Sequence, residues 1–217
     1  MDDGSTDGSA ELLQEFADGW DQVRLIPPMR EKGSSYVRSP GEQYNYLVEH
    51  CRGEKLLIQC AEIIHCDDIL TALDPYCHNN SISIATVLNC DMRKFTIDPT
   101  DEELKRKLVD VEPWQVKASK ITLESDRMVI QCPCSTGTTS QWRTVEHNGI
   151  SYAVADYSGY RRPFPFLFCG MITREDWDGY GGYADHYPAD TILGRQICAG
   201  NGQISFCKCL AIHIKHK

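Results

Sequence analysis

The stretch Gly53-Glu54-Lys55-Leu56-Leu57-Ile58-Gln59-Cys60-Ala61-Glu62 decides how this chain folds. Its centre is an almost unbroken apolar run of strand length, with a glycine before it and a carboxylate after it. A strand with one face in water alternates apolar and polar residues, whereas a strand covered on both faces is apolar throughout. Residues 55–60 are therefore predicted to form a strand that is covered on both faces of the sheet.

Helix and strand signals alternate on either side of this run. Before it, apolar residues from Tyr44 to Cys51 recur at the spacing of an amphipathic helix. After it, residues 69–73 suit a short helix and residues 81–88 suit a second buried strand. Such alternation is typical of parallel strands joined by crossover helices. We expect an α/β fold whose sheet is mixed but mostly parallel and is flanked by helices.

The rest of the chain is more polar up to about residue 150 and then becomes apolar again. One charged helix is expected at 101–108 in the polar part. The elements expected after it are a strand at 166–173, a turn of helix at 174–179, a helix at 190–199 and a strand at 203–214.

Composition limits the class of function. A net charge of -9 argues against binding to duplex nucleic acid, which needs a basic footprint. No run approaches the roughly 18 apolar residues of a transmembrane segment. The 11 cysteines, an odd count, lie mostly in apolar runs, which indicates buried, reduced thiols. With no signal peptide at the start, the expected location is cytoplasmic.

The chain opens with Asp2-Asp3-Gly4-Ser5-Thr6-Asp7, an acidic turn that leads into a helical pattern. This stretch resembles the Asp-Asp-Gly-Ser-x-Asp signature of family-two glycosyltransferases of the GT-A type. In that family the signature follows the second strand, so the chain is expected to lack the first strand and helix. The resemblance implies that Asp3, with Asp2 beside it, binds the base or ribose of a donor nucleotide. The alternative is an ordinary Asx turn with a helix cap.

A second block has the spacing of the same family. Asn45 is followed by a helix, by Gly-Glu and by the apolar strand, and Cys60-Ala61-Glu62 then stands where the family has its Asp-x-Asp metal motif. The resemblance implies that Asn45 and Glu62 bind the nucleotide-sugar and that Glu62 also holds Mn²⁺ or Mg²⁺. Cys60 replaces the first aspartate, and a thiolate is a poor ligand for such hard ions. The simpler interpretation is a buried cysteine and a surface glutamate at a strand end.

Residues 59–65 also resemble a subgroup of the family with viral and phage members. That subgroup has Gln-Asn-Pro-Glu-x-x-His at this place, where this chain has Gln-Cys-Ala-Glu-Ile-Ile-His. The first aspartate of the metal motif is absent there too. Its loss in this chain therefore need not mean loss of activity.

A third block, residues 168–177 followed by Gly181-Gly182-Tyr183, resembles the strand, short helix and Gly-Gly-Phe-Asp-Glu turn of the family's acceptor side. Ala184 replaces the aspartate of that turn, and Asp185 keeps the acidic position after it. Asp190 then matches the aspartate of the family's Glu-Asp-x-x-Leu-x-x-Arg signature, with Ala189 in place of the glutamate. The resemblance makes Asp190 the general base. It also suits the N-cap of the following helix.

Three further positions are weaker candidates. His216 follows the last strand, where several relatives supply a metal ligand, but a free histidine on a surface tail is an equal alternative. Trp142 and His147 precede the acceptor-side strand, and an aromatic ring can stack on a sugar. A single tryptophan is more often a core residue than a binding residue.

The resemblance implies one GT-A domain over residues 1–217, with a nucleotide-binding half at 1–90 and an acceptor-side half at 91–217. Its expected activity is inverting transfer of a sugar from a UDP- or GDP-linked donor to an acceptor hydroxyl. One alternative is an inactive relative that only binds the nucleotide-sugar. Another is a structural zinc module, whose candidate ligands are Cys132, Cys134, Cys207, Cys209 and His213.

Overall fold

The computed structural model describes residues 1–2, 5–28, 40–90, 121–123, 127–131, 141–147, 150–156, 169–185 and 189–214. The chain divides into two compact units. One unit is Met1–Arg52 with Tyr183–Ala189, and the other is Gly53–Gly182 with Asp190–Lys217. The helix expected at 101–108 lies outside the described residues.

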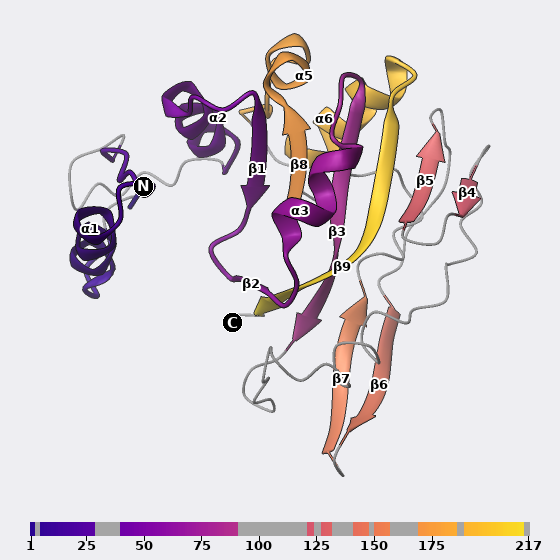
Figure 1. Ribbon diagram of the computed structural model, residues 1–217, viewed down its shortest axis with the longest axis horizontal. Helices are drawn as coiled ribbons and strands as arrows, with labels where there is room; N and C mark the ends of the chain where they lie inside the picture. The colour runs from indigo at the N-terminus through magenta and orange to yellow at the C-terminus, as the bar shows by residue number, and fades with distance from the viewer. Residues whose placement is uncertain are drawn as a thin grey trace. The chain divides into compact units, whose positions relative to one another are not determined.

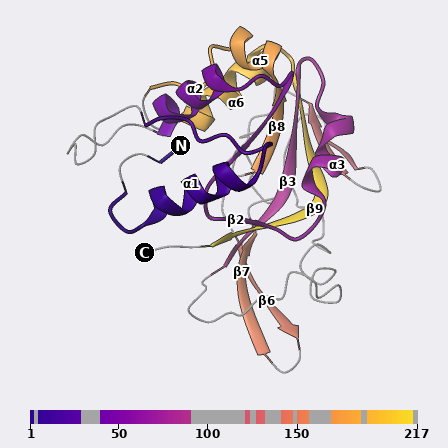
Figure 2. The same ribbon diagram turned by 60° about the vertical axis from the view of Figure 1, so that its left-hand side comes forward.

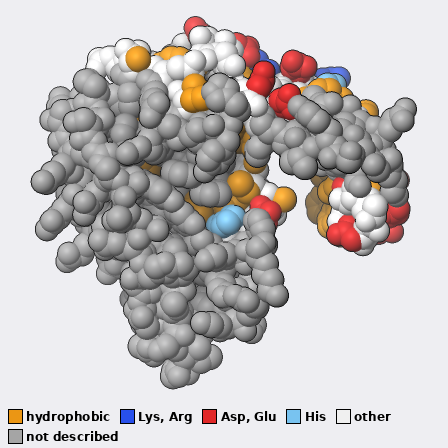
Figure 3. Space-filling model, turned by 180° about the vertical axis from the view of Figure 1, so that it is seen from behind, with side chains coloured by type: hydrophobic (Ala, Val, Ile, Leu, Met, Phe, Trp, Pro, Cys, Tyr) orange, Lys and Arg blue, Asp and Glu red, His pale blue; other side chains and the backbone are white. Residues whose placement is uncertain are grey.

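Two helices make up most of what is described of the first unit. They are α1 (Ser9–Gly19) and α2 (Pro40–His50), and both were predicted from apolar spacing. Gly8 precedes α1 with a φ of 91°, a left-handed conformation that costs glycine little. None of the α1 residues is buried. Acidic and hydrophobic side chains of α1 are both visible on the surface in Figure 3.

The second unit contains a nine-stranded sheet (Figure 1). Its main path runs β1-β8-β3-β9-β5-β4, while β2 pairs with β9, and β7 pairs with both β3 and β6. The strands are β1 (Lys55–Gln59), β2 (Ile63–His65), β3 (Ser81–Cys90), β4 (Ile121–Leu123), β5 (Arg127–Gln131), β6 (Gln141–His147), β7 (Ile150–Asp156), β8 (Cys169–Thr173) and β9 (Gln203–Ile214).

The expectation of a mostly parallel sheet is wrong. Among the strand pairs of the described residues, only β3 and β9 run parallel. β8 is inserted between β1 and β3 and is antiparallel to both, so β1, β3 and β9 all run in one direction. Parallel neighbours need a crossover connection of a dozen or more residues, whereas β4 and β5, and β6 and β7, are two or three residues apart in the chain and pair antiparallel. The α/β class is correct at this coarser level.

Helices cover the sheet of this unit on both faces. The short helix α3 (Ile69–Leu73), continued by a 3-10 turn (Asp74–Tyr76), lies against one face of β3 and β9. The helix α6 (Ala189–Ala199) lies on the other face (Figures 1 and 2). The third helix, α5 (Arg174–Gly179), directly follows β8. All three were predicted from the sequence.

Burial along the strands corrects the prediction for residues 55–60. In β1, Leu56 and Ile58 are buried, whereas Leu57 and Gln59 are half-buried. The reason is position, since β1 stands at the end of the sheet's main path and a long run of apolar residues does not reveal this. β8 is buried at every residue, and β3 is buried at each residue whose burial is described.

Candidate functional site

The opening acidic turn is held by its own side chains. The Ser5 N–H donates to Asp2 Oδ2 at 3.0 Å, and the Ser9 N–H donates to Asp7 Oδ1 at 3.1 Å. The Ser9 bonds lower the pKa of Asp7. These contacts are those of an Asx turn before a helix, the alternative interpretation of this stretch. Asp3 lies outside the described residues, and donor binding by Asp2 and Asp3 stays a prediction.

Glu62 is the last residue of the three-residue turn, 60–62, that joins β1 to β2. Because β2 pairs antiparallel with β9, Ile63 stands opposite His213. The turn that carries Glu62 is therefore next to the last residues of β9, as Figure 1 also shows. This pairing therefore brings Glu62, a candidate ligand of a metal ion, close to the end of β9. His216 itself lies outside the described residues.

The first and last side chains of the Gln-Cys-Ala-Glu-Ile-Ile-His segment contact each other. His65 Nε2 lies 2.6 Å from Gln59 Oε1, a hydrogen bond that links the end of β1 to the end of β2. His65 Nε2 also lies 3.9 Å from the Cys169 thiol. The hydrogen bond between Gln59 and His65 closes the loop that carries Glu62. It also gives a physical reason why glutamine and histidine stand at these two positions.

The thiols near this loop are packing groups. Cys169 is fully buried, and burial raises the pKa of its thiol to about 12, with a smaller contribution from Cys60. Cys207 and Cys209 lie in the same apolar cluster as Ile69 and Leu73 of α3, and burial raises the pKa of the Cys209 thiol. Thiols that stay protonated are poor metal ligands and poor nucleophiles.

No three histidine, cysteine or acidic side chains come together to hold a metal ion anywhere in the described part of the chain. The zinc module therefore gains no support from Cys207, Cys209 and His213, while Cys132 and Cys134 lie outside the described residues. Manganese and magnesium differ from zinc here, because one or two carboxylates plus substrate phosphates can suffice for such ions. Glu62 is a carboxylate that fits this arrangement.

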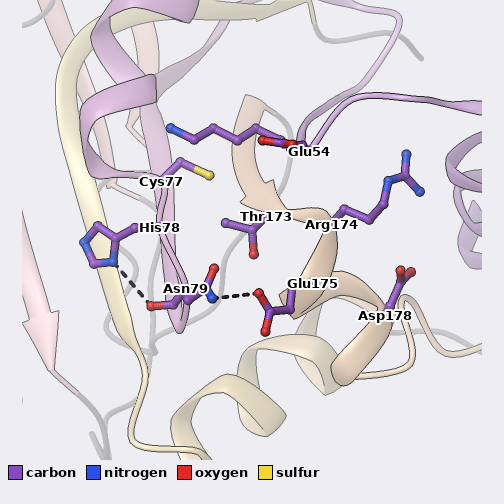
Figure 4. A pocket seen from close by; sticks show the side chains of 9 residues that line it. Glu54, Cys77, His78, Asn79, Thr173, Arg174, Glu175 and Asp178 are labelled. Carbon is purple, nitrogen blue, oxygen red and sulfur yellow. Dashed lines mark hydrogen bonds between the residues drawn. The ribbon is translucent and has the colours of Figure 1, made fainter.

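A pocket of about 850 Å³ opens at the opposite edge of the sheet, where β1 begins and β8 ends (Figure 4). Its cations are engaged: Lys55 Nζ lies 2.9 Å from Asp74 Oδ1, and Arg174 Nε donates to the Gly53 carbonyl at 3.0 Å. Asn79 Nδ2 donates to Glu175 Oε2 at 2.7 Å across its floor. None of the residues predicted as functional lines this pocket.

At the segment predicted to form the acceptor side, the structure describes a contact that spacing did not reveal. Asn45 in α2 hydrogen-bonds both backbone groups of Tyr183, and the ring of Tyr44 packs edge-on against that of Tyr183. Asp185 follows two residues later and is exposed. Asn45 is thus brought to the Gly-Gly-Tyr turn. Its predicted role in donor binding is a separate question that these contacts leave untested.

The remaining predicted residues are placed only by their backbone. Asp190 is the second residue of α6. Trp142 and His147 lie near opposite ends of β6, where Trp142 pairs with Ala155 and His147 with Ile150. Five residues of strand separate two positions by roughly 17 Å, more than one sugar ring spans. These two strand positions are therefore too far apart to serve one sugar ring.

A scan of the sequence against protein-family models found no match, and a search of curated proteins found none either. Within the described ranges, every helix is too short or too polar to cross a membrane.

Proposed function

We propose that this protein is a glycosyltransferase that moves a sugar from a nucleotide-diphosphate donor to an acceptor hydroxyl. The observation that carries the proposal is the β2–β9 pairing, with Ile63 opposite His213. It brings the Glu62 turn to the end of β9, where the resemblance expects a carboxylate and a terminal histidine. The Gln59–His65 hydrogen bond adds support, because it joins two residues of the motif that carries Glu62.

The direction of the strands also supports the proposal. β1 and β3 both run in the direction of β9. β3 is next to β9, whereas β8 lies between β1 and β3. In α/β sheets, ligands bind beyond the carboxyl ends of such strands. Glu62 follows the carboxyl end of β1. It therefore stands at the edge of the sheet where a donor would be expected.

The proposed reaction is a single displacement at the anomeric carbon. Asp190 accepts the proton of the acceptor hydroxyl while the hydroxyl oxygen forms the new glycosidic bond. The bond from the anomeric carbon to the diphosphate breaks in the same step, so the configuration inverts. Glu62 would hold Mn²⁺ or Mg²⁺, which when bound supplies positive charge to the leaving diphosphate. Asp2 and Asp3 would orient the nucleotide.

Manganese-dependent binding of UDP tests the donor site, and calorimetric titration measures it. Glu62→Ala is expected to reduce the affinity for UDP at least tenfold in the presence of Mn²⁺, because the protein's carboxylate to the ion is lost. Glu54→Ala is the matched control, since Glu54 precedes the same strand at its other end and is exposed. Equal affinity of the two variants, or no binding of UDP or GDP by the unaltered protein, would contradict the proposal.

Asp190→Asn separates catalysis from binding. The amide cannot accept the proton, so transfer from a UDP-sugar should fall at least a hundredfold, the lower end of the usual gain from a general base. UDP affinity should change less than twofold. Sugar transfer is followed by release of UDP from UDP-glucose, UDP-galactose or UDP-N-acetylglucosamine. An unaltered protein that binds UDP but releases none from these or the GDP-linked sugars would instead favour the inactive relative.

A further inference from the structure

The side chain of Asn45 hydrogen-bonds both the N–H and the carbonyl of one residue that is distant in the sequence. Its Nδ2 donates to the Tyr183 carbonyl at 2.7 Å, and the Tyr183 N–H donates to its Oδ1 at 2.9 Å. The two residues are 138 positions apart in the chain. A carboxamide can donate and accept at once, so a single asparagine does here what a neighbouring strand does in a sheet.

Two further contacts hold the same segment against α2. The ring of Tyr44 meets the Tyr183 ring edge-on, with centroids 5.5 Å apart and planes at 80°. Gly41 lies so close to the segment that a Cβ there would collide with the Ala184 carbonyl. Tyr183 is only 6% exposed. Hydrogen bonds, an aromatic contact and a close backbone approach therefore all fix Tyr183 and Ala184 to α2.

The two residues before Tyr183 are held separately, since the Gly181 N–H donates to the Asp178 carbonyl at 3.1 Å and the Gly182 N–H donates to the Trp177 carbonyl at 2.8 Å. Gly181 and Gly182 have φ values of 77° and 65°, in a region that glycine enters and leaves with little cost. Asp185 comes two residues after Tyr183 and is exposed. The contacts of Tyr183 and Ala184 with α2 therefore hold the backbone immediately before Asp185.

We infer that Asn45 is a positioning residue for the acceptor-side turn, which it holds through Tyr183, and not a ligand of the donor. The inference rests on the proposed function for the role of that turn. Two of the four hydrogen-bonding positions of the Asn45 amide are already used by Tyr183. Losing this side chain should disturb the turn and leave nucleotide affinity intact.

The test compares Asn45→Leu, which loses both hydrogen bonds, with Asn45→Asp, which keeps the acceptor for the Tyr183 N–H. Glu49→Ala is the control, because Glu49 is exposed on the same helix. We expect hydrogen exchange of the Tyr183 amide to rise about tenfold in Asn45→Leu and less in Asn45→Asp. The Kd for UDP with Mn²⁺ should change less than twofold in all three.

The turnover number distinguishes a positioning role in the reaction from a purely structural role, which would leave it unchanged. With UDP-glucose and Mn²⁺, kcat of Asn45→Leu should fall about tenfold while KM for UDP-glucose stays within twofold. Unchanged exchange at Tyr183, or faster exchange with unchanged kcat, would overturn the inference. Loss of UDP affinity would return Asn45 to the donor site. If the unaltered protein does not bind UDP, the proposed function fails, and the exchange rate alone decides whether Asn45 holds the turn.

Discussion

At the residue scale, burial decides what the cysteines of this chain do. Cys77, Cys169, Cys207 and Cys209 are buried in one apolar cluster, and desolvation raises the pKa of the Cys77 thiol to about 11. Burial disfavours the charged form, so the thiols of Cys77, Cys169 and Cys209 stay neutral over the physiological range. The four cysteines of this cluster therefore pack under α3. The composition alone allowed metal binding as well.

The pKa of Cys169 predicts a loss of stability at alkaline pH. Its thiol has a folded-state pKa of about 12 against an ordinary value of 9.0, with burial the first cause and Cys60 the second. Between these values the unfolded chain gives up a proton that the folded chain keeps. The free energy of unfolding contributed by this group is complete below pH 9.0 and falls above it, by up to about 1.4 kcal/mol per pH unit.

Cys169→Ala should remove this pH dependence. Urea denaturation between pH 8.5 and 10.5 is expected to show a free energy of unfolding that falls less steeply in the variant than in the unaltered protein. Cys51→Ala is the control, because Cys51 is exposed. Parallel curves for Cys169→Ala and the unaltered protein would show that this thiol ionises normally in the folded state.

At the scale of the element, α3 shows how a five-residue helix is made stable. Asp68 caps it by accepting from the Thr71 N–H at 3.2 Å and from the Thr71 hydroxyl at 2.7 Å. Isolated helices of this length do not form in water, so packing must supply most of the stability. Ile69 and Leu73 provide that packing, since they are 1% and 0% exposed.

Two leucines of α3 give a matched pair of substitutions. Leu73→Ala is expected to lower the free energy of unfolding by about 2–5 kcal/mol, because it leaves a cavity in the core. Leu70→Ala should change it by less than about 0.5 kcal/mol, because Leu70 is 56% exposed. Chemical denaturation of both variants measures the difference. Similar losses in the two would mean that α3 packs through a different face.

At the scale of the whole molecule, the two units are described separately and differ in how they are held. In the sheet-containing unit, β9 pairs with β2, β3 and β5, and its residues 204–207 and 209–213 are all buried. The acidic, exposed α1 of the other unit has no buried residue. The stability of the molecule is thus concentrated along β3 and β9.

Hydrogen exchange should follow this division. The amides of β3 and β9 are expected to exchange slowest, through global unfolding, because they are hydrogen-bonded within buried strands. The amides of α1 should exchange orders of magnitude faster, since little apolar packing opposes local opening. Mass spectrometry of peptic fragments measures both regions in one sample. Equal protection of α1 and β9 would contradict this distribution of stability.

The sequence by itself determined the local elements where apolar spacing is strong. It placed α1, α2, α3, α5, α6, β1, β3 and β9 close to their observed bounds, because each carries a periodic or continuous run of apolar residues. The strands β2, β4, β5, β6 and β7 were not predicted: β2 and β4 have three residues each, β6 is mostly polar, and the alternation along β7 was overlooked. The motif positions of Glu62 and Asp190 came from resemblance, and their roles stay proposals.

Only the tertiary structure decided which strands are neighbours and which side chains meet. The insertion of β8 between β1 and β3 gave two antiparallel pairs in place of a parallel one, and the β2–β9 pairing brought Glu62 beside the end of the last strand. The contact between Asn45 and Tyr183 was equally invisible in the sequence. The physical reason is that local propensity acts over a few residues, whereas these pairings join residues 86 to 150 positions apart and depend on the packing of each unit.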